Sequence, residues 1–148
     1  MKVIIQRVQK AWIKSFDKDK LLDVASIQKG VVIYVGFCKD DTEQNIAKFA
    51  RKLFDLPIFE NHEGKLKLSL ADIDGEAIIV PNFTLCGSNK KWRAIDYSKW
   101  ASFAEGKKLR EILRTYFEGS GKVQFWVFGS YMQIWSLADG PVNLDIDF

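Results

Sequence analysis

The sequence predicts a single α/β domain of mixed β-sheets with two main helical regions, and three observations lead to this prediction. Short runs rich in β-branched residues are separated by polar or glycine-containing breaks, as in a meander of strands. Two stretches carry apolar residues at helical spacing. The chain of 148 residues is long enough for one core and too short for a second domain. We therefore expect residues 1–148 to form one domain in which helices pack on sheets.

The first half of the chain is expected to contain several strands, one helix and a hairpin. Asp41 is a candidate cap for the helix, with Gln44 three residues on, and Pro57 closes the apolar pattern that follows. A hairpin is expected around residues 61–64, with His62 in its turn. The expected strands cover residues 2–8, 11–16, 21–25 and 31–37.

The second half is expected to contain a buried strand, a helical region and further strands. The apolar run of residues 77–80 leads into residues 81–85. The helical region spans roughly residues 97–118, and Gly106 either kinks it or divides it in two. The remaining strands are expected around residues 123–128, 131–137 and 142–148.

The last ten residues place a Gly-Pro step directly before a strand of strict alternation. Glycine tolerates unusual dihedral angles, proline fixes φ, and the bond before proline is where a cis peptide costs least. The step Gly140-Pro141 is therefore either a turn that starts the last strand or a rigid part of a site. The residues expected to face the core are Val142, Leu144, Ile146 and Phe148, with Asn143, Asp145 and Asp147 facing outward.

The composition limits the kinds of catalytic site and the cellular location that we expect. Cys38 and Cys86 are expected to be lone cysteines, and His62 is the only histidine, so neither a zinc site nor a histidine relay can be assembled. The apolar run at the N-terminus is too short for a signal peptide, and no stretch approaches the ~18 apolar residues that a membrane helix needs. We expect a cytoplasmic protein that uses no metal or other cofactor and does not associate with a membrane.

Positive charge is concentrated in one part of the chain. Residues 86–114 carry eight Lys or Arg against three acidic residues, although the whole chain has a net charge of only +3. Such a stretch is either a docking surface for a polyanion or an ordinary solvated helix face. Trp92 is expected to be exposed within it and able to stack on bases, whereas Trp100 and Phe103 have the spacing of helix residues that face a core.

Motifs that run nearly end to end resemble the D-aminoacyl-tRNA deacylase family, small homodimeric enzymes that clear D-amino acids from mischarged tRNA. The motifs include the Phe83-Thr84-Leu85 step and the segment Asp139-Gly140-Pro141-Val142. Their order and spacing, more than any single motif, support the resemblance. The other matching segments are residues 3–8, 39–43, 58–60, 63–65, 68–70, 75–76 and 128–129 with Met132.

Three signatures of that family are altered here. The family's Ser-Gln-Phe-Thr-Leu appears as Pro81-Asn82-Phe83-Thr84-Leu85, and its Gly-Pro-Val-Thr has Asn143 in place of the threonine. Its Arg-Pro-Ser-Phe segment appears as Arg93-Ala94-Ile95-Asp96. In its proline at position 81 the chain resembles a divergent branch of the family, in which the serine is also replaced by proline and chiral selection is relaxed. That branch keeps glutamine where Asn82 stands.

The resemblance implies a homodimer with its active site at the subunit interface. It implies that Gly140 and Pro141 enter the partner's site as a chiral filter, and that Arg7 braces them through backbone hydrogen bonds, for which its rigid fork is suited. Phe83 and Met132 would line a pocket for the terminal adenosine of the tRNA, beside Pro81. The implied contacts with tRNA phosphates are made by Lys90, Lys91 and Arg93.

The chemistry of an activated ester indicates what the site must supply. Hydrolysis needs an oriented water or vicinal hydroxyl and donors for the developing oxyanion, and the resemblance implies that the terminal 2′-hydroxyl of the tRNA takes part. No base is evident beside Thr84 in the sequence, so a positioning or oxyanion role is favoured over covalent catalysis or a purely structural role. Backbone N–H groups near Phe83 and Thr84 are further candidate donors. Asn82 keeps an amide that is one methylene shorter than glutamine.

The implied activity is hydrolysis of D-aminoacyl-tRNA, and of glycine mischarged on tRNA, as translation quality control. One alternative is a divergent deacylase with relaxed chirality that acts on a mischarged L-aminoacyl-tRNA. Another is a paralogue that binds tRNA ends without turnover, which retained affinity without cleavage would identify. A scaffold dimer that does not bind nucleic acid is a third, and it predicts no salt-dependent RNA binding.

Overall fold

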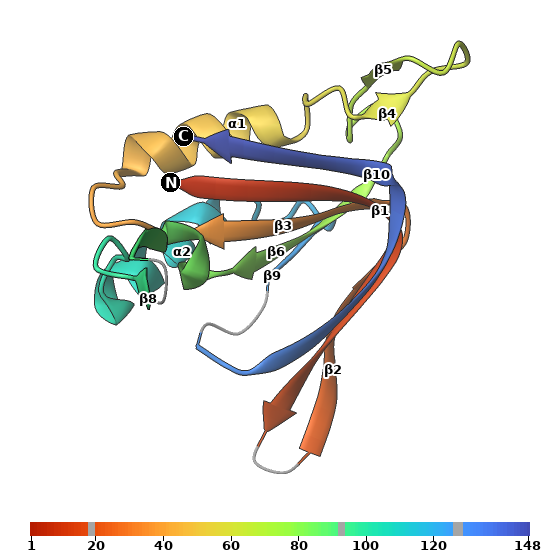
Figure 1. The fold of residues 1–148 in the computed structure, drawn as a ribbon. Helices are drawn as coiled ribbons and strands as arrows, with labels where there is room; N and C mark the ends of the chain where they lie inside the picture. Colours follow the sequence, from red (N-terminus) through yellow and green to blue (C-terminus); the bar gives the residue numbers. More distant parts are fainter. Residues whose placement is uncertain (18–19, 92–93, 126–128) are drawn as a thin grey trace.

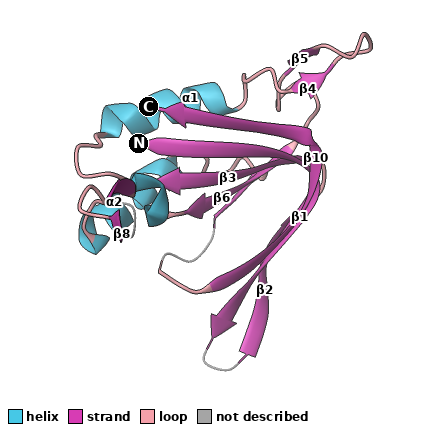
Figure 2. Cartoon of the chain, viewed as in Figure 1, coloured by secondary structure: helices cyan, strands magenta, loops and turns pink. Residues whose placement is uncertain are grey.

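The main feature of the fold is one twisted sheet in the strand order β10-β1-β3-β6-β9, with β2 paired to β1 (Figures 1 and 2). The computed structural model describes residues 1–17, 20–91, 94–125 and 129–148. β1 is antiparallel to β2, β3 and β10, whereas β3, β6 and β9 are parallel, so the predicted mixed α/β fold is confirmed. The strands are β1 (Lys2–Asp17), β2 (Lys20–Ile27), β3 (Gly30–Gly36), β6 (Glu76–Pro81), β9 (Val123–Phe125) and β10 (Met132–Asp147).

The two helices, α1 (Glu43–Leu53) and α2 (Phe103–Thr115), bury their apolar sides against one face of this sheet. Side chains alternate along β3, so Ile33 and Val35 face the helices while Val32 and Tyr34 face the opposite side. There a second, smaller core forms against the far halves of β1 and β2. Figure 1 shows β1 and β10 bending together, and the pairing of these strands shifts register between Gln6 and Lys10.

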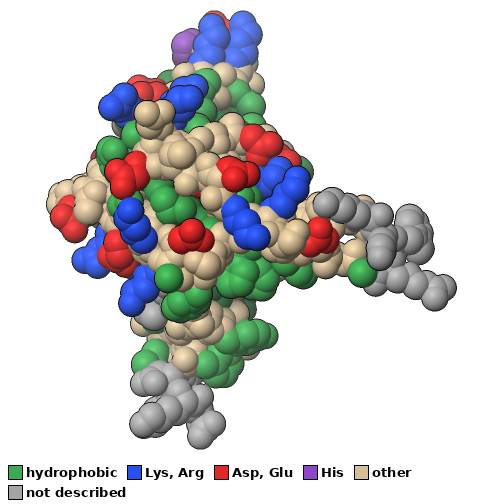
Figure 3. Space-filling model, turned by 90° about the vertical axis from the view of Figure 1, so that its left-hand side faces the viewer, with side chains coloured by type: hydrophobic (Ala, Val, Ile, Leu, Met, Phe, Trp, Pro, Cys, Tyr) green, Lys and Arg blue, Asp and Glu red, His purple; other side chains and the backbone are tan. Residues whose placement is uncertain are grey.

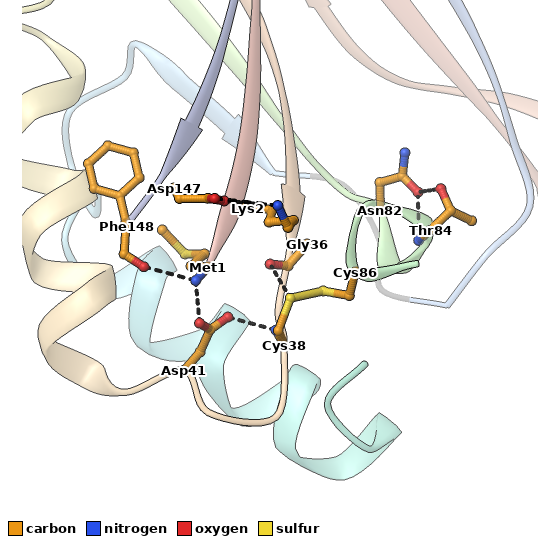
Figure 4. Close-up of a disulfide and its surroundings, with 10 residues drawn as sticks. All are labelled: Met1, Lys2, Gly36, Cys38, Asp41, Asn82, Thr84, Cys86, Asp147 and Phe148. Atoms are coloured by element: carbon orange, nitrogen blue, oxygen red, sulfur yellow. Dashed lines mark hydrogen bonds and ion pairs between the residues drawn. A yellow bond between two sulfur atoms is a disulfide. The ribbon is translucent and has the colours of Figure 1, made fainter. Parts of the chain in front are cut away.

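The helix starts differ from the sequence prediction. α1 is capped by Thr42, whose backbone N–H donates to the Asn45 side chain at 2.8 Å, so the predicted pair of Asp41 and Gln44 is wrong by one residue. Asp41 instead accepts a hydrogen bond from the Cys38 backbone N–H at 2.6 Å and pairs with the Met1 amino group (Figure 4). A carboxylate with these two partners joins the start of β1 to the loop after β3.

α2 begins only after Ser102, which forms a reciprocal capping box with Glu105. The predicted start at residue 97 is wrong because Asp96 accepts a hydrogen bond from the Ser98 N–H, and the Trp100 N–H donates to the Tyr97 carbonyl, which makes a turn. Gly106 is buried inside an unbroken helix and does not divide it.

Two short hairpins flank the sheet. β4 (Phe59–Glu60) and β5 (Leu66–Leu68) enclose the predicted turn at residues 61–64, which is confirmed. β7 (Ser88–Lys91) and β8 (Ala94–Asp96) form a hairpin for which the sequence analysis assigned no element.

The strand that contains Gly140-Pro141 is continuous, so the predicted break into residues 131–137 and 142–148 is wrong. The prediction of separate strands at residues 2–8 and 11–16 is wrong for the same reason, because β1 and β10 bend together without a break. The predicted alternation is confirmed, since every second residue from Val142 to Phe148 is half-buried and the intervening ones are exposed. The bond between Gly140 and Pro141 is cis.

A disulfide joins Cys38, just after β3, to Cys86 at the end of the 3₁₀ turn η1 (Phe83–Cys86) (Figure 4). The prediction of two lone cysteines is therefore wrong. The two Cα atoms lie 5.8 Å apart although 48 positions separate the residues, so the pairing depends on the tertiary fold. No helix in the described part of the chain is long and apolar enough to cross a membrane.

Candidate functional site

A pocket of about 470 Å³ opens where the ends of β3 and β6 face the first residues of β10. Its walls are mostly apolar and aromatic, with few polar groups, which is the usual character of a site for a flat organic ligand. The sequence-predicted residues Pro81, Asn82, Phe83 and Met132 meet in this pocket. Residues that the sequence analysis did not select also line it, namely Tyr34, Trp100, Phe103, Ser130 and Tyr131.

Tyr34 brings a hydroxyl to a wall that is otherwise built from β3 and β6 aliphatic residues. The phenol of Tyr34 is protonated at neutral pH, as in any tyrosine, and burial raises its pKa further, so it can donate a hydrogen bond to a ligand. The only sequence signal for this residue is one tyrosine within the aliphatic run of residues 31–35.

Asn82 and Thr84 form a local network at the start of η1 (Figure 4). The Asn82 Oδ1 atom accepts hydrogen bonds from the Thr84 backbone N–H at 3.1 Å and from the Thr84 Oγ1 hydroxyl at 2.5 Å. An amide oxygen is a very weak base, so this contact orients the hydroxyl without activating it as a nucleophile. The shorter amide of asparagine therefore has a specific use here, because it fixes the turn that carries Phe83 and Thr84.

The Trp100 and Phe103 side chains both line the pocket; Trp100 is half-buried and also packs against the main core, whereas the core assignment of Phe103 is wrong because its side chain is exposed. Trp100 precedes the first turn of α2, and its ring centroid lies 4.8 Å from that of Phe83. Phe103 is 55% exposed. Trp92, which was expected to be exposed, lies outside the described residues.

Gly140 and Pro141 lie on an exposed part of β10 where its pairing with β1 stops at Ala138 and resumes at Asn143. Gly140 has φ of +119°, and a Cβ atom there would lie 2.8 Å from the Val142 backbone nitrogen, so glycine is required. Neither residue lines the pocket of its own chain. Met132, which does line it, lies eight positions earlier, roughly 26 Å along an extended strand.

Arg7 holds this segment in place from β1. Its Nε donates to the Asp139 carbonyl at 3.2 Å and lies 3.1 Å from the Asp139 carboxylate. Its Nη1 donates to the Ile58 carbonyl at 3.0 Å, and its Nη2 lies 3.5 Å from Glu60. The arginine is only 4% exposed, so its charge is neutralised and hydrogen-bonded inside the protein.

The structure describes only part of the basic stretch, residues 86–114. Lys90 and Lys91 belong to β7, but the structure does not describe their side chains, and Arg93 lies outside the described residues. Lys99 and Lys107 are exposed, and Lys108 lies 3.8 Å from Glu43 of α1. Figure 3 shows Lys, Arg, Asp and Glu side chains interspersed over this end of the molecule. The described residues contain no group of three or more His, Cys, Asp or Glu side chains placed to hold a metal ion.

Residues 4–147 match the family model described as D-Tyr-tRNA(Tyr) deacylase. The chain belongs to this family. A D-aminoacyl-tRNA deacylase of Thermosipho africanus (strain TCF52B) is 38% identical over 148 residues, covering 99% of this chain and 97% of that protein. The D-aminoacyl-tRNA deacylase of Aquifex aeolicus (strain VF5) is 36% identical with the same coverage.

A solved structure titled c-Myc DNA Unwinding Element Binding Protein has the same fold, with a TM-score of 0.88 over 100% of this chain and 99% of that one, at 24% sequence identity. The likeness covers almost all of both chains, so the two share one fold. Among the altered family signatures, Pro81 and Asn82 lie in the pocket wall, whereas Asn143 is exposed on β10.

The bracing by Arg7 predicts a clear effect on stability. Arg7→Lys keeps the charge but cannot contact Ile58 and Asp139 at once, so we expect the free energy of unfolding to fall by about 2–4 kcal/mol. Urea unfolding followed by circular dichroism measures the loss. The matched control is Lys2→Ala, which removes a solvent-exposed pair with Asp147 at 3.2 Å and should cost less than about 1 kcal/mol. Equal losses for the two variants would show that Arg7 does not brace the segment.

Proposed function

We propose that this protein hydrolyses the ester bond that joins a D-amino acid, or glycine, to the 3′ end of tRNA, and so removes mischarged products before translation. The observation that carries the proposal is the meeting of Asn82 and Phe83 from the family segment with Met132 around one pocket, with Thr84 hydrogen-bonded to Asn82 behind the lining. Membership of the deacylase family over residues 4–147 supports the same reaction. Aminoacyl-tRNA is used in the cytoplasm, which we propose as the location.

The terminal adenosine would enter the pocket between the Phe83 ring and Met132. The walls offer stacking surface from Phe83 and Trp100, and the Tyr34 hydroxyl offers a hydrogen bond to the edge of the base. The ester would then lie at the mouth of the pocket beside Asn82 and Thr84. Phosphates farther along the tRNA would meet the basic stretch, with Lys90, Lys91 and Arg93 as the contacts.

The reaction itself needs orientation more than an activated side chain. A water molecule or the vicinal 2′-hydroxyl of the tRNA attacks the carbonyl carbon, and the carbonyl oxygen gains negative charge. In Figure 4 the amide nitrogen of Asn82 points away from Thr84, so it is free of that contact and suited to donate to this oxygen. Thr84, whose hydroxyl is held by Asn82, acts as a positioning group.

The position of Gly140-Pro141 supports a homodimeric site. These residues are exposed and far along β10 from the pocket of their own chain, so a second copy of the chain is needed to bring them to it. The neighbouring residues Trp135 and Leu137 on β10 are also exposed, which is consistent with a face that another copy covers. A filter made of main-chain atoms at this step excludes an L side chain by steric contact.

An alternative activity has one specific observation in its favour. Pro81 forms part of the pocket wall and lacks both the hydroxyl of serine and a backbone N–H. A chiral filter next to Pro81 would have fewer polar contacts with the substrate than one next to serine. The corresponding function is a deacylase with relaxed chirality that acts on a mischarged L-aminoacyl-tRNA.

The test is hydrolysis of matched D-aminoacyl-tRNA, L-aminoacyl-tRNA and glycyl-tRNA by the purified protein. We expect loss of the D-ester and of the glycyl ester, because glycine has no side chain for a steric filter to reject, and we expect ordinary L-esters to survive. Cleavage of an L-ester at a comparable rate would favour the relaxed alternative. Binding of all three without cleavage of any would identify a tRNA-end binder and contradict the proposal.

The role of Thr84 is tested in the same assay. Thr84→Ala and Asn82→Ala each remove one side of the contact that orients the turn, so each should slow cleavage of the D-ester and the glycyl ester by about 10- to 100-fold without changing their ratio. Thr84→Ser keeps the hydroxyl and should retain most of the rate. Recovery of a covalent adduct between the amino acid and Thr84 would instead make the threonine a nucleophile.

A further inference from the structure

Four aromatic side chains from two segments, η1 and residues 97–103, lie at the pocket and its rim. We call Phe83, Tyr97, Trp100 and Phe103 the ring surface. The Phe83 ring lies 4.8 Å from Trp100 at an interplanar angle of 38°, and 5.6 Å from Tyr97 at 63°. Phe83, Trp100 and Phe103 line the pocket, whereas Tyr97 lies outside its lining. The surface therefore begins inside the pocket and continues beyond its rim.

The ring surface exposes more aromatic side chain to solvent than is favourable for apolar groups. Phe83 is 46% exposed, and Tyr97 is 38% exposed with Ile95 beside it. A Cβ atom at Gly87 would lie 2.9 Å from the Tyr97 ring and 3.0 Å from the Ile95 side chain, so glycine at this position lets both lie against the end of η1. Figure 3 shows exposed hydrophobic side chains among and below the charged ones on this face of the molecule. A contiguous exposed apolar patch next to a pocket is typical of a binding surface.

The rings are held in place before any ligand arrives. The Trp100 N–H donates to the Tyr97 carbonyl at 3.0 Å, and Trp100 forms a β-bridge with Cys38. The disulfide from Cys38 to Cys86 then ties this segment to η1, which carries Phe83. The segments that present the rings are thus connected by covalent and main-chain links, which lowers the entropy that a ligand must overcome to order them.

Two exposed lysines lie near the ring surface in the backbone. The Lys39 N–H donates to the Lys99 carbonyl at 2.9 Å, so the main chains of these two residues, distant in sequence, lie next to each other beside Trp100. Hydrogen bonds from Ser102 keep the pKa of Glu105, in the first turn of α2, below its usual value, and the Lys39 charge adds a smaller effect in the same direction. Flat rings with cations at their side match a single strand of nucleic acid, which offers bases to stack and phosphates to pair.

We propose that the ring surface binds the unpaired nucleotides that precede the terminal adenosine of the tRNA, with Tyr97 stacking on a base outside the pocket. This inference rests on the proposed function, because the pocket is assigned there to the terminal adenosine. Continuity of the rings with that pocket selects the adjoining nucleotides as the occupant, and the flanking lysines favour RNA over an apolar protein segment. Stacking on these rings is tolerant of sequence, so every tRNA acceptor end is a suitable ligand.

The test compares a single-stranded RNA trinucleotide that ends in adenosine with adenosine 5′-monophosphate, by isothermal titration calorimetry on the full-length protein. Wild-type protein should bind the trinucleotide more tightly than the mononucleotide. Tyr97→Leu keeps an apolar side chain but removes the ring, so it should weaken trinucleotide binding by about 5- to 100-fold and leave mononucleotide binding unchanged. The matched control is Tyr116→Leu, an exposed tyrosine at the other end of α2, which should change neither.

The outcomes separate this inference from the proposed function. Equal affinity of wild-type protein for the two ligands, or an equal loss of both in Tyr97→Leu, would overturn the role of the ring surface while ester cleavage continued. Absence of ester cleavage and of mononucleotide binding in wild-type protein would overturn the proposed function itself. A change in self-association of Tyr97→Leu, measured by sedimentation velocity, with trinucleotide affinity intact would assign the rings to a protein contact and contradict the inference.

Discussion

The antiparallel pairing of β1 with β10 is the constraint on which the rest of the structure depends. These two strands run side by side over most of their length, from Lys2 with Asp147 to Ser15 with Met132. One end of β10 therefore closes the pocket at Met132, and the other end carries the alternating residues that pack against the helices. Between them the pairing is interrupted, and Gly140-Pro141 stands at the surface where Arg7 holds it. A single strand thus carries both Met132 at the pocket and the Gly140-Pro141 step, which the fold of one chain keeps apart.

The pocket depends on a different set of connections, which fix the loops after β3 and β6. The disulfide and the bridge from Cys38 to Trp100 hold η1 against the segment before α2. Asn82 then sets the geometry of the first turn of η1 through two hydrogen bonds to Thr84. Because these contacts are made within the chain and need no ligand, the pocket is preorganised, as the proposed catalysis by positioning requires.

Several features could be predicted from the sequence because their signals are local. Strict alternation after Pro141 predicted which side chains of the last strand face the core, and Asn61 and Gly64 predicted a turn. Helical spacing alone placed the exposed Phe103 in the core, since it does not say where a helix begins; the capping pair of Ser102 and Glu105 was the available signal. The pairing of Cys38 with Cys86 could not be predicted, because only the tertiary fold brings together two residues 48 positions apart.

The central claim is that the pocket of one chain is completed by Gly140-Pro141 of another, and mixed dimers test it most directly. One chain carries Phe83→Ala, which damages the pocket, and the other carries Gly140→Ala, whose Cβ would displace the backbone of the filter. Differently tagged chains are purified as the mixed dimer, and folding is checked by circular dichroism. Our account predicts about half of the wild-type activity on D-esters with L-esters spared, because one site combines an intact pocket with the partner's intact filter. Cleavage of L-esters by the mixed dimer, as by the Gly140→Ala homodimer, would contradict it.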